Sequence, residues 1–207
     1  MLTEIIKPFG PSIVKARLPL ELINEINNYV ENVIKNEKLS HELDYGKNLA
    51  GNVKQEIELN IEFMQKIKWG EFLGRIVKDW ADKELNKNLK DFRIKSSWVV
   101  RQFKNEYNPV HWHTGDISGV GYLKIPKKFG NTFQTKKTMN RNGEIELING
   151  SRKLFSDCTY VITPVVGDLY LFPSYMMHTV YPFFNTSEER RSVSFNAKID
   201  EDAAQLS

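Results

Sequence analysis

The stretch that decides the fold class runs from residue 92 to residue 103 and reads FRIKSSWVVRQF. Its polar and apolar residues alternate, and it is rich in the β-branched and aromatic residues that suit a pleated sheet, so we predict a strand. A second segment of this kind covers residues 118–126 and closes at Pro126. Turn residues separate further predicted strands at Glu144–Ile148, Thr159–Ile162, Asp168–Phe172 and Arg191–Ala197. Many short strands at this spacing favour an antiparallel sandwich or barrel.

The residues before this β region are predicted to be mostly helical. After Pro19, which suits a first helical turn, apolar residues recur every three or four positions at Leu22, Ile23, Ile26, Val30 and Ile34. A second apolar stripe predicts a helix from about Trp69 to about Leu85. Residues 39–58 are polar and patternless, and we expect a loop there. We therefore expect one domain over residues 1–207, with residues 1–90 as helical support packed on one sheet and residues 91–200 as the β core.

Composition limits the class of protein. With 207 residues, of which 41% are apolar and 12% aromatic, the chain can build one substantial core. No stretch approaches the ~18 consecutive apolar residues of a membrane span, and the first residues lack the layout of a signal peptide. The lone Cys158 excludes an internal disulfide and a cysteine-rich zinc site. We expect a cytoplasmic protein without a membrane partner.

The charge balance argues against a nucleic-acid partner. The chain has 29 basic and 26 acidic residues, a net charge of +3, which is too small an excess to indicate nucleic-acid binding. The densest basic stretch, Lys124–Lys137, is read as a solvated loop. The expected partner is a small-molecule or peptide substrate, which the sequence does not identify.

Three of the four histidines fall within or beside the predicted strands. Residues two apart on a strand point to the same side, so His111 and His113 project into one space. Asp116, beyond the Thr114–Gly115 step, can bring a carboxylate oxygen to it. His178 follows the strand at residues 167–173 and reaches the same point only if the sheet closes on itself. These residue types and positions predict a metal site.

Two sets of ligands are compatible with this pattern. Two histidines and one carboxylate occupy one face of an octahedral metal and leave three positions open, the usual arrangement of non-haem ferrous oxygenases. If Asp116 is not a ligand, His111, His113 and His178 form a three-histidine site that suits iron, zinc or a similar metal.

A candidate anion site follows His178. Arg190 and Ser192 share one face of the last predicted strand, and a guanidinium beside a hydroxyl is shaped to bind a carboxylate. A dicarboxylate anchored there could extend a keto acid to the metal and fill two of its open positions. Tyr122, on the strand after the histidines, could donate its phenol to the same carboxylate.

Together these motifs resemble a known family. They are residues 107–123, YNPVHWHTGDISGVGYL, residues 167–178, GDLYLFPSYMMH, and residues 190–196, RRSVSFN. In this order they resemble the 2-oxoglutarate and Fe(II)-dependent oxygenase superfamily, in particular a branch found in marine bacteria and their phages. The resemblance covers roughly residues 95–197. It implies a double-stranded β-helix, or jelly roll, with helices packed on its major sheet.

The resemblance also implies roles for residues. His178 corresponds to the distal iron ligand, Arg190 and Ser192 hold the far carboxylate of the cosubstrate 2-oxoglutarate, and Tyr122 assists. The usual proximal motif is His-x-Asp or His-x-Glu, whereas this chain reads His111-Trp-His113. The proximal ligands are therefore His111 with His113, His113 with Asp116, or His111 with Asp116; a fourth alternative has no third protein ligand, as in some halogenases.

The implied reaction splits 2-oxoglutarate into succinate and carbon dioxide and oxidises a substrate, by default through hydroxylation. Residues 127–143 and 149–157 are expected to shape substrate access. Two alternatives are a cupin-type dioxygenase with three histidines and no 2-oxoglutarate, which gives Arg190 and Ser192 no task, and a non-enzymatic β-sandwich that binds a ligand.

Overall fold

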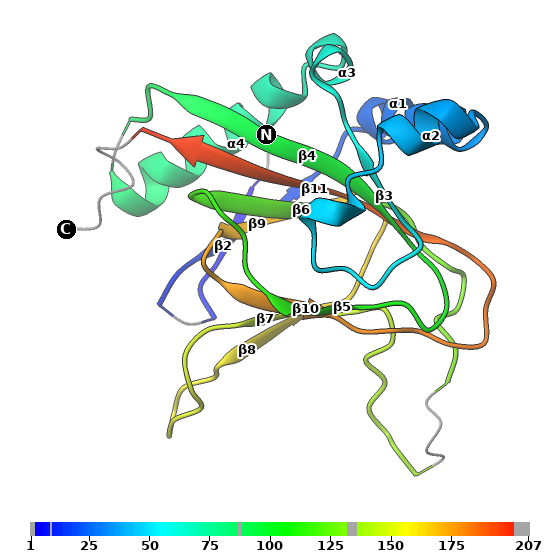
Figure 1. Ribbon diagram of the computed structural model, residues 1–207. Helices are drawn as coiled ribbons and strands as arrows, with labels where there is room; N and C mark the ends of the chain where they lie inside the picture. Colours follow the sequence, from blue (N-terminus) through cyan, green and yellow to red (C-terminus); the bar gives the residue numbers. More distant parts are fainter. Residues whose placement is uncertain (1–2, 9, 87, 132–135, 201–207) are drawn as a thin grey trace.

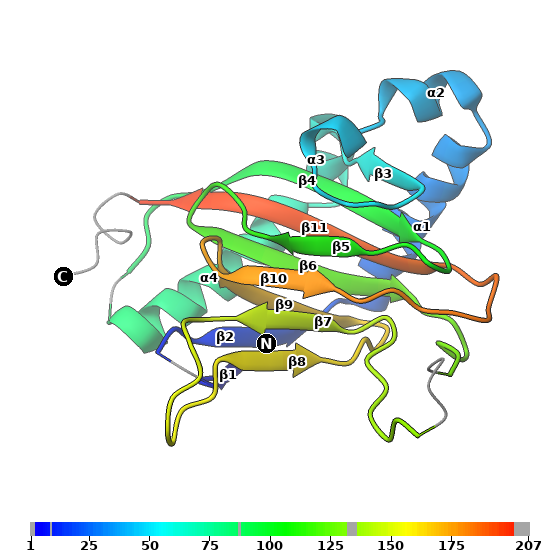
Figure 2. The same ribbon diagram turned by 60° about the horizontal axis from the view of Figure 1, so that its bottom comes forward.

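Two antiparallel β-sheets face each other in the computed structural model, which describes residues 3–8, 10–86, 88–131 and 136–200 (Figures 1 and 2). The larger sheet has seven strands, in the spatial order β1 (Glu4–Ile6), β2 (Ile13–Arg17), β9 (Asp168–Pro173), β6 (Ile117–Lys124), β11 (Arg190–Ile199), β4 (Phe92–Gln102) and β3 (Gln55–Glu58). The smaller sheet has four, in the order β5 (Asn108–His111), β10 (Met177–Val180), β7 (Ile145–Ile148) and β8 (Thr159–Ile162).

The helices cover the face of the larger sheet that points away from the smaller one (Figure 1). The two long helices are α1 (Leu20–Ile34) and α4 (Trp69–Leu85), and the short ones are α2 (Glu37–Glu42), α3 (Ile61–Lys66) and the 3-10 turn η1 (Gly46–Asn48). Helix α1 buries Ile23, Ile26 and Val30, which belong to its predicted apolar stripe, and also Val33, while Leu22 and Ile34 of the stripe are partly buried. This stripe and that of α4 form one core with the outward side chains of β4, β9 and β11.

A second core fills the space between the two sheets. It contains Val120 and Tyr122 from β6, Phe172 from β9, and Ile145 and Leu147 from β7. Strands β6 and β9 thus have apolar side chains on both faces, and they read as nearly continuous buried runs. The larger sheet is therefore covered on both faces, by the helices on one and by the smaller sheet on the other.

The architecture confirms the predicted jelly roll of mainly β structure and the helices at Leu20–Ile34 and Trp69–Leu85. The prediction of a loop over residues 39–58 is wrong, because that segment contains most of α2, the turn η1 and strand β3. The first ninety residues also contribute β1 and β2, so they complete the larger sheet as well as supporting it. Strands β5 and β10 were not predicted. None of the helices in the described ranges is both long and apolar enough to cross a lipid bilayer.

Gly119 on β6 provides a test of packing between the helices and the larger sheet. A Cβ at this position would lie 2.4 Å from Cε1 of Phe195 and 2.9 Å from the backbone oxygen of Tyr170. We expect Gly119→Ala to lower the free energy of unfolding by about 1–3 kcal/mol, measured by denaturant titration.

Gly70→Ala is the matched control. A Cβ at Gly70, in the first turn of α4, meets only the end of Ile94 at 3.8 Å, and alanine favours the helix, so stability should be equal or slightly higher. Equal effects of the two substitutions would contradict this account of the packing.

Candidate metal centre

Three histidine rings meet between the two sheets. His111 on β5 and His178 on β10 are direct partners across the antiparallel pair, and such partners project from the same face of a sheet. Their ring centroids lie 4.2 Å apart. His113, just beyond the end of β5, lies 5.0 Å from each of them. One ring nitrogen from each residue falls within 4.8 Å of the others, which is the spacing of ligands around a single metal ion.

Backbone carbonyl oxygens orient the rings of His111 and His178, and a backbone hydrogen bond holds His113 in place. The Nδ1 atom of His111 lies 2.7 Å from the Pro109 carbonyl oxygen, and that of His178 lies 3.1 Å from the Met176 oxygen. A carbonyl oxygen only accepts, so both Nδ1 atoms donate and both Nε2 atoms keep a lone pair for a metal. The backbone N–H of His113 donates to the Ser174 oxygen at 3.0 Å, which ties this residue to the turn before β10.

Burial keeps the histidines in the form that binds a metal. It lowers the pKa of His111, and together with neighbouring imidazoles it lowers the pKa of His113 to about 4 and that of His178 to about 3. All three rings are therefore neutral at pH 7, and no proton has to leave before a metal binds.

Asp116, which the sequence also proposed as a ligand, is placed elsewhere. Its Oδ2 atom accepts the backbone N–H of Ile199 at 3.0 Å, and it lines a separate cavity beside Trp80 and Tyr175. Gly115 turns the chain away from the histidines with a φ of +124°, and a Cβ there would lie 2.8 Å from the Ala197 oxygen. Of the alternatives that the sequence left open, the three-histidine set is the one that the fold brings together.

Arg190 and Tyr122 form a buried polar pair on the same inner face. Arg190 is 1% exposed, and its Nη1 lies 3.4 Å from Oγ of Ser192. Its guanidinium carbon lies 5.1 Å from the centre of the Tyr122 ring. The Nε and Nη2 atoms of Arg190 and the Tyr122 hydroxyl have no hydrogen-bond partner among the described residues. Burial raises the pKa of Tyr122 to about 12, so its hydroxyl keeps the proton it can donate.

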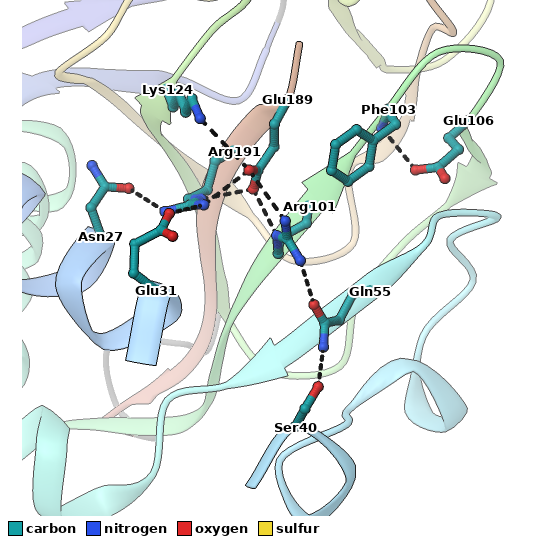
Figure 3. A network of polar contacts seen from close by, with 10 residues as sticks. All are labelled: Asn27, Glu31, Ser40, Gln55, Arg101, Phe103, Glu106, Lys124, Glu189 and Arg191. Carbon is teal, nitrogen blue, oxygen red and sulfur yellow. Dashed lines mark hydrogen bonds and ion pairs between the residues drawn. The ribbon is translucent and has the colours of Figure 1, made fainter. Parts of the chain in front are cut away.

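The neighbouring Arg191 has a structural task, because successive residues of a strand point to opposite faces. Figure 3 shows its guanidinium bound to Glu189 at 2.8 Å and to Glu31 of α1 at 2.8 Å. Glu189 also accepts from Arg101, which in turn donates to Gln55 of β3. Burial acts to raise the pKa of Glu189, but hydrogen bonds from the two arginines outweigh it and the pKa is lowered. This network joins α1, β3, β4 and β11 behind the inner face.

The three histidines, Arg190 and Ser192 line one cavity. Its wall contains His111, His113, His178, Arg190, Ser192, Ser194, Trp98, Val100, Val120, Phe172, Glu56, Leu49 and Ala50, among others. No residue of the expected access segments, 127–143 and 149–157, is among the described lining residues. Leu49 and Ala50, from the segment before β3, line the cavity instead.

Glu56 is the lining residue that the sequence reasoning missed. It lies on β3, is 2% exposed, and its Oε1 atom has no hydrogen-bond partner in the structure. Burial, followed by the nearby charge of Asp44, raises the pKa of Glu56 to about 7. The four residues of β3 sit in a stretch without periodicity, so no local signal marked this carboxylate as buried.

Comparison with protein families identifies the chain. The family described as "Putative 2OG-Fe(II) oxygenase" matches residues 96–196, a range that contains the three histidines, Tyr122, Arg190 and Ser192. The matched region, just under half of the chain, belongs to the 2-oxoglutarate and Fe(II)-dependent oxygenase superfamily. This oxygenase is thus an oxidoreductase that depends on ferrous iron and 2-oxoglutarate, as its sequence motifs predicted. The narrower branch of marine bacteria and phages stays a prediction.

Solved structures of oxygenases share its fold. A prolyl-4-hydroxylase of Pseudomonas putida has a TM-score of 0.55 at 16% identity, over 89% of this chain and 91% of that chain. A prolyl hydroxylase of Trichoplax adhaerens, in complex with a hypoxia inducible factor peptide, has a TM-score of 0.55 at 15% identity, over 93% and 85%. HygX of Streptomyces hygroscopicus, with nickel, 2-oxoglutarate and hygromycin B bound, has a TM-score of 0.57 at 10% identity, over 89% and 82%. At such identities the likeness shows the fold alone. Comparison with curated protein sequences gave no significant match.

Metal content distinguishes the possible ligands. We expect His113→Ala and His178→Ala to weaken iron binding at least about tenfold, because each removes one of three converging nitrogens. Asp116→Asn should retain about one iron per chain in elemental analysis of protein loaded anaerobically, since its carboxylate binds the Ile199 amide. Loss of iron from the Asp116 variant with retention in the His113 variant would exclude the three-histidine set.

The raised pKa of Glu56 predicts a pH-dependent effect on stability. Because its folded-state pKa of about 7 lies above the ordinary value of 4.5, the native protein holds an extra proton in this window and loses stability as the pH rises through it. Metal-free Glu56→Gln lacks this loss, so its unfolding free energy relative to wild type should rise between pH 4.5 and pH 8 by up to about 3 kcal/mol. Denaturant titrations at several pH values measure the difference, and a difference independent of pH would contradict it.

Proposed function

We propose that this oxygenase binds iron through His111, His113 and His178 and binds the far carboxylate of 2-oxoglutarate through Arg190, Ser192 and Tyr122. The default outcome is hydroxylation of a C–H bond in a substrate that is not identified. The observation that carries this proposal is the set of unpartnered donors on Arg190 and Tyr122, in the inter-sheet space that also holds the three histidines.

The donors present fit the cosubstrate chemically. A buried guanidinium without an acidic partner is costly, and a carboxylate is the group that satisfies its forked N–H donors. Ser192 and Tyr122 are direct partners across β11 and β6, so a carboxylate held by Arg190 has two hydroxyls beside it. Burial lowers the pKa of Arg190, yet an arginine stays protonated at neutral pH and supplies the positive charge.

The metal set also fits. Three neutral imidazoles leave the full charge of a ferrous ion to balance the dianionic cosubstrate. When bound, iron and 2-oxoglutarate supply the oxidation of the substrate by molecular oxygen, with release of succinate and carbon dioxide. The protein holds the ligands through the β5–β10 pair, anchors the cosubstrate at β11, and excludes water with Trp98, Val120 and Phe172.

The three-histidine set is shared with the alternative of a cupin-type dioxygenase. Family membership and the buried Arg190 favour the dependence on 2-oxoglutarate. Strands β1, β2 and β3 of residues 1–90 share the larger sheet with β4, β6, β9 and β11 of residues 91–200, which supports a single oxygenase domain over residues 1–207. A small molecule or peptide remains the proposed type of substrate, and the cytoplasm the proposed compartment.

Arg190→Met tests the cosubstrate site. Anaerobic addition of Fe(II) and 2-oxoglutarate should give the wild-type protein the weak visible charge-transfer band of a chelated keto acid. In the variant we expect iron to bind normally and the half-saturating concentration of 2-oxoglutarate to rise about 10- to 100-fold, because a charge-assisted hydrogen-bonded contact is lost.

Arg93→Met is the control for this test, since Arg93 lies on β4 with its side chain 72% exposed. It should titrate like the wild type. Failure of the wild type to give either the band or any succinate in air would overturn the proposed function, and an unchanged titration of Arg190→Met would overturn the assigned cosubstrate site.

A further inference from the structure

Glu56 shares a row of the inner sheet face with the proposed cosubstrate site. The pairings run from Glu56 on β3 to Val100 on β4, then to Ser192 on β11 and Tyr122 on β6. Direct partners point to the same face, and neighbouring strands lie about 4.8 Å apart, so the backbone at Glu56 is roughly 10 Å from that at Ser192. The cavity thus has a guanidinium on one strand and a carboxylate two strands away, at the edge of the sheet.

The Glu56 carboxylate has no cation to balance it. Among the described residues no lysine, arginine or histidine forms an ion pair with it. The nearest arginine along the sheet edge, Arg101, is engaged with Gln55 and Glu189 on the opposite face (Figure 3). Burial of a carboxylate without a partner costs free energy, and such carboxylates are found at sites where a bound ligand supplies the partner.

Neither iron nor 2-oxoglutarate is the ligand that completes Glu56. Glu56 lies outside the group of nitrogens that converge within 4.8 Å. The cosubstrate is an anion and is repelled by a carboxylate. The remaining occupant of the cavity is the substrate itself.

The chain passes close to Glu56 at a glycine. A Cβ at Gly51 would lie 2.8 Å from Oε1 of Glu56 and 3.1 Å from Nδ2 of Asn108, so the absence of a side chain lets the backbone approach both polar groups. Asn108, on the same strand as His111, also lines the cavity, as do the neighbouring Leu49 and Ala50. A carboxylate beside an amide, next to short apolar side chains, is suited to a polar nitrogen on an aliphatic chain.

We propose that Glu56 binds the substrate of this oxygenase and selects one that carries a positively charged nitrogen, either a primary ammonium or a guanidinium. This inference rests on the proposed function, because it takes the histidine cavity as the site of oxidation. A charge-assisted hydrogen bond to Oε1 supplies the missing partner of the carboxylate and holds the substrate across the cavity from Arg190.

The test uses iron-loaded protein with 2-oxoglutarate in air and measures succinate formation with added probes. The cationic probes are the Nα-acetyl amides of L-lysine and L-arginine, and the neutral counterparts are the Nα-acetyl amides of L-norleucine and L-citrulline. We expect at least one cation to raise the wild-type rate several-fold and its neutral counterpart to have no effect. In Glu56→Gln the half-saturating concentration of that cation should rise at least tenfold, and Glu56→Asp, which keeps the charge, should recover part of the response.

Glu42→Gln is the matched control. It removes a negative charge from α2, where the side chain is 57% exposed and does not line the cavity, so its basal rate and its response to the cation should equal those of the wild type. Thermal unfolding verifies that Glu56→Gln is folded, and the anaerobic charge-transfer band shows that it still binds iron and 2-oxoglutarate.

The outcomes separate the two levels of the proposal. A normal band with no wild-type response to any of the cations overturns the inference about Glu56 and leaves the proposed function intact. An equal cation response in Glu56→Gln, or an equal wild-type response to the neutral probes, also overturns it. Absence of the band from the wild-type protein overturns the proposed function and the inference with it.

Discussion

The site depends on the register of one short antiparallel pair, in which His178 of β10 stands opposite His111 of β5. Side chains alternate along a strand, so a slip by one residue would turn one histidine to solvent and replace it with Met177 or Trp112. Strand β10 is fixed on its other edge by four successive pairings with β7. The backbone N–H of His113 donates to the Ser174 oxygen, and the backbone N–H of Ser174 donates to the Asp116 oxygen. These two bonds join the segment after β5 to the turn before β10. Main-chain hydrogen bonds thus bring the three histidines together without the help of a metal.

A second constraint separates two adjacent arginines by function. The pleat of β11 directs Arg190 into the cavity and Arg191 toward α1, where Glu31 and Glu189 neutralise it. The outer arginine holds the strand against its helix, and it leaves the inner arginine with donors to offer. The fold tolerates the buried charge of Arg190 because the hydrogen bonds of Arg191 with Glu189 and Glu31 stabilise the same strand on its other face.

Periodicity was sufficient to predict the two long helices and six of the strands, because in each of them one face or both faces are buried. The polar site could be anticipated where residues adjoin in sequence, as with Arg190 and Ser192. The choice between Asp116 and the three-histidine set could not, since it depends on the turn at Gly115 and on a contact with Ile199 at the far end of the chain. Glu56 was out of reach as well, because its inward orientation comes from pairing with β4, some forty residues later in the sequence.

The position of Glu56 on an edge strand has an evolutionary consequence. Strand β3 is the last strand of the larger sheet beside β4, is joined to residues 43–45 on its other side by a single bridge, and lies before residue 96, where the match to the oxygenase family begins. The proposed iron ligands and the proposed cosubstrate anchor all lie within the matched region, on or directly beside strands β5, β6, β10 and β11. The side chain of Glu56 takes no part in the network of Figure 3, so a substitution there can change the cavity wall without breaking those contacts. Selection at this one position can therefore alter the proposed substrate contact independently of the proposed iron site.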